Sequence, residues 1–103
     1  MTPQFTESQR DVLARLAKRY VWWESPEQAL HFPLRVIAHV MNVGDWDDVC
    51  TLVGALGTGP LRETLETAVV GQFSPRSWSY WHYRLGLIAP GASPPPTPSR
   101  RTA

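Results

Sequence analysis

The sequence predicts an all-α fold, a compact single domain built from five main helices and one short helix. Two observations support this prediction. Residues typical of helix starts recur at short intervals, with Ser, Thr or Asp as N-caps and Pro at first helical positions. Apolar residues after these starts recur at helical spacing rather than at the alternating spacing of strands. We expect the helical domain to span residues 1–88, with a disordered proline-rich tail at 89–103.

The first two helices are predicted from their N-terminal residues. Thr6 and Gln9 fit a capping box that opens a helix over about 7–20. Its apolar face is Val12, Leu13, Leu16, Ala17 and Tyr20. After Val21, Trp22 and Trp23, which are too few for a confident strand, Ser25 and Pro26 open a short helix.

The middle of the chain predicts three further helices. Pro33 opens a helix of about 34–42, and Asp45 with Asp48 resembles a capping box for one of about 46–56. Apolar residues cover more than half of the latter: Trp46, Val49, Cys50, Leu52, Val53 and Leu56. We therefore expect this helix at the centre of the core, with Cys50 as a buried structural thiol. Pro60 opens the next helix, whose apolar side is Leu61, Leu65, Ala68 and Val69.

The most informative segment is the last predicted helix, at about 75–85. Five of the eleven aromatic residues lie between Phe73 and Gly86, and Ser74, Pro75 and Gly86 fit its N-cap, first position and stop. At 100° per residue one face holds Trp78, Trp81 and Leu85, with His82 at its edge. The other side holds Arg76, Tyr80, Tyr83 and Arg84.

We expect the Trp/Leu face to be buried, whereas two interpretations remain open for the Tyr/Arg face. Tyr and Arg are enriched at binding hot spots, so this face fits a protein partner, supported by Trp22 or Trp23. Alternatively, the helix is packed on both sides and its Tyr hydroxyls are hydrogen-bonded at the edge of the core.

Composition limits the classes of function. A chain of 103 residues is enough for one domain, and a net charge of +1 gives no general field that attracts nucleic acid or membranes. The single cysteine cannot form an internal disulfide, which suits a reducing compartment. The sequence shows neither a signal-peptide pattern nor an apolar run of membrane-spanning length. We therefore expect a soluble cytoplasmic protein.

The sequence offers little catalytic chemistry. It has no phosphate-binding glycine loop, no readable catalytic triad, and three histidines without ligands at metal-binding spacing. The acidic residues Asp45, Asp47 and Asp48 stand at a helix start, where capping explains them. We expect no enzymatic activity, no catalytic residue, no cofactor and no metal.

Two alternatives use the last helix. Arg76 and His82 match the Arg–x(4–6)–His spacing of HEPN ribonucleases, although six positions on a continuous helix separate them by about 120°. In the second, the helix forms a DNA-binding helix-turn-helix with its predecessor through the link 71–74, and Arg76, Ser79, Tyr80 and Arg84 contact phosphates. The near-neutral charge does not favour nucleic acid.

Two blocks of sequence resemble a family of small bacterial proteins. The first block consists of residues 19–30 and 35–44, and the second is Phe73–Gly86. Many members of that family are encoded beside nucleotidyltransferase-like toxins of the AbiEii type. The resemblance covers roughly residues 15–87 and implies an antitoxin-like role with a toxin as protein partner. It assigns no catalytic residue.

Overall fold

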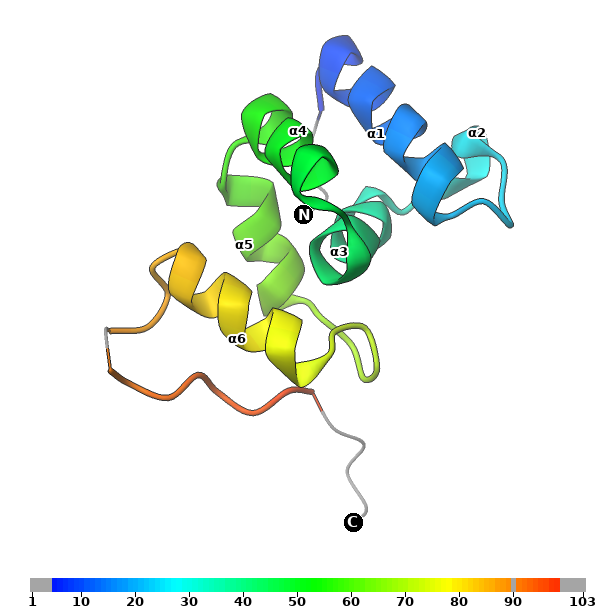
Figure 1. Ribbon diagram of the computed structural model, residues 1–103. Helices are drawn as coiled ribbons and strands as arrows, with labels where there is room; N and C mark the ends of the chain where they lie inside the picture. Colours follow the sequence, from blue (N-terminus) through cyan, green and yellow to red (C-terminus); the bar gives the residue numbers. More distant parts are fainter. Residues whose placement is uncertain (1–4, 90, 99–103) are drawn as a thin grey trace.

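The structure, a computed structural model, describes residues 5–89 and 91–98. In these ranges it contains six helices and no strand, which confirms the all-α prediction of five main helices and a short one (Figure 1). The helices are α1 (Glu7–Tyr20), α2 (Pro26–Ala29), α3 (Pro33–Val43), α4 (Trp46–Leu56), α5 (Gly59–Glu66) and α6 (Pro75–Arg84). None of them combines the length and the apolar character needed to cross a bilayer.

Local capping chemistry sets most of the helix boundaries. Thr6 and Ser25 form full capping boxes with Gln9 and Gln28. Asp45 also caps its helix, since its carboxylate accepts a hydrogen bond from the Asp48 N–H at 2.9 Å. The capping box predicted there is only half formed, because the Asp48 carboxylate is bound by α1. The Asp45 N–H donates to the Tyr20 hydroxyl instead, at 3.2 Å.

The centre of the core is α3, not α4 as the sequence predicted. Helix α3 contacts each of the other five helices. Four of its side chains are fully buried: Val36, Ile37, Ala38 and Val40. In α4 the buried stripe is limited to Val49, Leu52 and Leu56. Because neighbouring positions on a helix differ by about 100°, Cys50 turns away from this stripe. Cys50 is therefore exposed, which corrects the expectation of a buried thiol.

Helix α5 is shorter than expected. It ends at Glu66, so Val69 lies beyond the helix and is exposed rather than part of its apolar side. The segment 67–74 turns at Gly71, whose φ of +78° favours glycine. The Val69 N–H is bonded to the Gln72 side-chain oxygen at 3.2 Å. This bond holds the turn that leads into α6.

The proline-rich tail has no helix or strand in residues 91–98, as its composition predicts. It runs back along α6, in the direction opposite to the helix (Figure 1). The Trp78 indole N–H donates to the Pro95 carbonyl at 2.8 Å, and the Tyr83 hydroxyl donates to the Ala92 carbonyl. Pro90 and residues 99–103 of the predicted tail lie outside the described residues.

Candidate partner-binding surface

Helix α6 is fixed in place by the C-terminal end of α3. The last carbonyls of a helix have no partner within the helix. Here the Trp81 indole N–H donates to the Met41 carbonyl at 2.8 Å, and the Ser77 hydroxyl donates to the Asn42 carbonyl at 3.0 Å. The Ser74 N–H donates to the Asn42 side chain at 2.9 Å. These bonds fix the rotation of α6 about its own axis, and therefore which side chains face solvent.

That rotation gives α6 two different sides. Trp81 is 1% exposed, and Trp78 and His82 are also buried. Tyr80 and Tyr83 are each 46% exposed, and Arg76 and Arg84 are exposed. The arrangement agrees with the face assignment made from helical spacing. Leu85, expected on the buried face, is only partly buried because the helix ends at Arg84.

Tyr80 and Arg84 form a cluster with Trp46 of α4. The Arg84 guanidinium donates to the Tyr80 hydroxyl at 2.9 Å. Its central carbon lies 5.3 Å from the centroid of the Trp46 ring and 5.0 Å from that of Trp81. Arg84 is therefore held over several aromatic faces, a favourable position for a cation. We call the exposed residues Trp46, Tyr80 and Arg84 the aromatic–arginine surface.

A hollow of about 320 Å³ adjoins this surface. It lies between the end of α3, the start of α4 and α6, and its lining includes Trp46, Tyr80 and Trp81. Among the ion pairs of the described residues none involves Arg84, so its charge is available to an acidic group. The surface thus offers an apolar recess beside a cation.

Sequence reasoning placed Trp46 in the core, whereas the structure shows it 65% exposed. The sequence does contain a signal for this exposure, which is the position of Trp46 on its helix. Trp46 is the first residue of α4, and side chains on a helix lean toward its N-terminus. A side chain at the first position therefore projects beyond the helix end instead of covering a preceding turn. This direction brings the indole toward Arg84 of α6.

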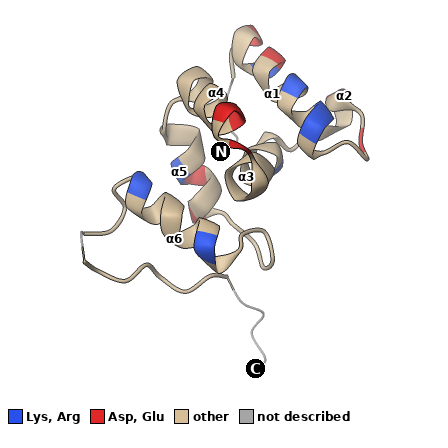
Figure 2. Ribbon diagram, in the orientation of Figure 1, with Lys and Arg blue, Asp and Glu red and all other residues tan. Residues whose placement is uncertain are grey.

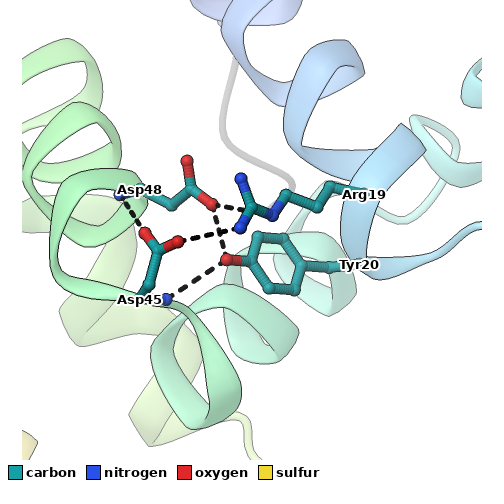
Figure 3. A network of polar contacts seen from close by, with 4 residues as sticks. All are labelled: Arg19, Tyr20, Asp45 and Asp48. Atoms are coloured by element: carbon teal, nitrogen blue, oxygen red, sulfur yellow. Dashed lines mark hydrogen bonds and ion pairs between the residues drawn. The ribbon is translucent and has the colours of Figure 1, made fainter.

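The start of α4 is held by a polar network with the end of α1 (Figure 3). Arg19 contacts the Asp45 and Asp48 carboxylates at 2.9 and 3.3 Å. The Tyr20 hydroxyl donates to Asp48 at 2.5 Å. Burial raises the pKa of Tyr20 above its usual 10.0, and the bond to Asp48 raises it further. The phenol therefore stays a donor, and the network positions the helix start that presents Trp46.

The remaining predicted site residues lie elsewhere. Tyr83 is bonded to the tail, and Arg76 lies exposed in the first turn of α6. Trp22 and Trp23 are 74% and 54% exposed. They belong to the link between α1 and α2, a segment that lies away from α6 in Figure 1. The structure thus brings Tyr80 and Arg84 together but does not bring the two indoles to them.

Trp23 instead packs edge-on against His39 of α3, with ring centroids 5.5 Å apart. The pKa of His39 is lowered from its usual 6.5, chiefly by burial and then by the positive charge of Arg35, while Glu24 acts in the opposite sense. Arg35 and Glu24 form an ion pair with each other. This region is a second exposed aromatic area, separate from the aromatic–arginine surface.

The geometry does not assemble the two alternative sites. Helix α6 is continuous from Pro75 to Arg84, so Arg76 and His82 stay about 120° apart. The His82 Nδ1 lies 2.7 Å from the Trp78 carbonyl, inside the protein. The link between α5 and α6 is residues 67–74 rather than the expected 71–74, and α6 packs mainly on α3. Figure 2 shows the basic residues of the described ranges distributed over α1, α3, α5 and α6.

Comparisons with known proteins find no match among models of protein families, curated proteins or solved structures.

Proposed function

We propose that this protein is an antitoxin-like interaction module that acts in the cytoplasm and binds a nucleotidyltransferase-type toxin. The toxin class comes from the resemblance of residues 15–87 to small proteins encoded beside AbiEii-type toxins. The contact surface comes from the chemistry of α6 and the start of α4. The two arguments are independent, so each can be tested separately.

The observation that supports the proposal most is the environment of Arg84. Three aromatic rings lie within 5.8 Å of its guanidinium carbon, yet the described residues pair it with no carboxylate. Stiff aromatic side chains contribute contact area at low entropy cost, and a held guanidinium binds a carboxylate in bidentate geometry. The partner surface we expect presents an acidic residue for Arg84 and an apolar side chain for the adjoining hollow.

The other predicted contacts belong to the rim of this interface or to a second one. Arg76 and Tyr83 are on the same helix and extend the surface along it. Trp22 and Trp23 lie on another part of the molecule, so a partner that also contacts them has to reach around α3. We therefore assign the main binding energy to Trp46, Tyr80 and Arg84.

The proposal is tested with an AbiEii-type nucleotidyltransferase toxin as the probe. We expect the full chain to bind it and to restore growth of cells that express it. Tyr80→Ala or Arg84→Ala is expected to weaken binding by more than about 1 kcal/mol, or about fivefold in Kd, with unchanged circular dichroism. Arg62→Ala is the matched control, because Arg62 is an exposed arginine of α5 whose one ion pair within the described residues is with Glu66.

Two results contradict the proposal. One is the absence of toxin binding by the natural chain, and the other is equal binding by the natural chain and Arg84→Ala. Random duplex DNA at two salt concentrations serves as a second probe. Micromolar DNA binding that weakens steeply with salt would favour the alternative of a DNA-binding regulator.

A further inference from the structure

The tail and α6 are joined by two hydrogen bonds, one of which involves Trp78, a residue outside the proposed partner surface. Two donors on α6, the Trp78 indole N–H and the Tyr83 hydroxyl, bind the carbonyls of Pro95 and Ala92. Both acceptors are main-chain carbonyls, and they are three residues apart. Both donors are aromatic side chains, and they are five residues apart on one helix.

These spacings fit a polyproline helix lying along an α-helix. A polyproline helix has three residues per turn, so carbonyls at positions i and i+3 point in the same direction, about 9 Å apart. Five residues of α-helix rise by about 7.5 Å, which is within about 2 Å of this distance. Pro94 lies between the two acceptors, Pro95 is itself one of them and Pro96 follows, so this conformation is the one its composition prefers.

The chemistry of the contact also fits polyproline recognition. A polyproline helix makes no internal hydrogen bonds, so its carbonyls are free to accept from a binding surface. Grooves lined by aromatic side chains bind such segments, and their ordering costs little entropy because the chain is already stiff. On α6 the Trp78 ring packs against His82, with centroids 4.4 Å apart, and against Phe73 at 5.8 Å.

We propose that Trp78 and Tyr83, on either side of one edge of α6, form a binding site for a polyproline segment, and that the chain's own residues 92–98 occupy it. The toxin proposal rests mainly on Trp46, Tyr80 and Arg84, whereas this inference rests on Trp78 and the tail, so the two can fail separately; Tyr83 belongs to the rim of the first surface and to this site. Occupancy by the tail shields the Trp78 indole and engages the Tyr83 hydroxyl. The tail is thus an intramolecular ligand of α6.

The test measures solvent exchange of the indole N–H groups in the full-length chain by NMR. Trp81 is an internal control, since its indole N–H is also bonded at 2.8 Å but to Met41 of the core. Exposed Trp22 is the reference for free exchange. We expect the Trp78 indole N–H to exchange about tenfold more slowly than that of Trp22.

The decisive variant changes Pro94, Pro95 and Pro96 to glycine, which keeps the carbonyls but removes the stiffness. Trp78 is expected to exchange about fivefold faster in this variant, with Trp81 unchanged. A synthetic peptide of residues 89–98 at millimolar concentration is expected to restore protection of Trp78, and a peptide with alanine at every proline is not. Tyr83→Phe should weaken the same protection by removing one of the two donors.

Three results overturn the inference. The first is equal Trp78 exchange in the natural chain and the triple-glycine variant. The second is faster exchange of both Trp78 and Trp81 in that variant, because the tail would then support the core instead of occupying a site. The third is protection that rises with protein concentration, which would assign the occupant to the tail of a second copy.

Discussion

Single side chains in this protein differ in role according to small differences in position on a helix. Tyr80 and Trp81 are adjacent in sequence, yet the Tyr80 hydroxyl faces solvent beside Arg84, whereas Trp81 is enclosed in the core. The Trp81 ring still contributes to both sides, because Arg84 lies over its face. The aromatic–arginine surface is therefore built directly on a core residue, which makes it rigid.

His39 provides a prediction at the residue scale. Because its pKa is lowered in the folded protein, the unfolded chain takes up a proton first as the pH falls below 6.5. The stability contributed by neutral His39 is thus present above that pH and is lost as the pH falls through the folded-state pKa. Urea unfolding between about pH 5 and 7.5 should show a steeper loss of stability for the natural chain than for His39→Gln. Parallel curves would show that the prediction is wrong.

At the scale of helices, contacts at the helix termini position the helices that form the aromatic–arginine surface. The end of α3 receives donors from α6. At the end of α1 the Tyr20 hydroxyl donates to Asp48 and accepts from the Asp45 N–H at the start of α4. The aromatic–arginine surface lies between these two junctions. Its geometry therefore depends on hydrogen bonds that satisfy exposed helix ends, as well as on apolar packing.

The junction of α1 and α4 is tested by Tyr20→Phe. The change removes the donor to Asp48 and the acceptor of the Asp45 N–H without altering the ring. We expect the free energy of unfolding to fall by about 1–3 kcal/mol, measured by urea titration, because the half-buried Asp48 carboxylate and the Asp45 N–H each lose a partner. Tyr83→Phe removes one bond from an exposed hydroxyl and should cost less. An equal cost in both variants would contradict the structural role of the network.

At the scale of the whole molecule, the sequence predicts the helices better than their packing. Helix starts follow from local residues such as Thr6, Asp45 and Ser74, which act within one turn. Exposure of Cys50 depends on which neighbours cover α4, and no local pattern contains that information, whereas exposure of Trp46 had a local signal in its first position on α4. The early end of α5 had a local signal, because β-branched Thr67, Val69 and Val70 precede Gly71.

For the candidate site, as for the fold, the sequence predicts features within one helix but not contacts between helices. Helical spacing separated Tyr80 and Arg84 from the buried tryptophans, since all of them lie on one helix. The contribution of Trp46 and the separation of Trp22 and Trp23 from α6 depend on the tertiary arrangement. The contact of Trp78 with Pro95 was likewise hidden, because proline content predicts the absence of helix but does not predict a binding site.

The central claim is that α6 has an inward side that holds the fold and an outward side that is free for a partner. Urea unfolding of Trp81→Ala and Arg84→Ala tests it most directly. Trp81→Ala should lower the free energy of unfolding by about 3–5 kcal/mol, because it removes a buried ring and the donor to Met41. Arg84→Ala should lower it by no more than about 1 kcal/mol, since Arg84 is itself exposed and forms no ion pair within the described residues. A loss for Arg84→Ala as large as that for Trp81→Ala would contradict the account.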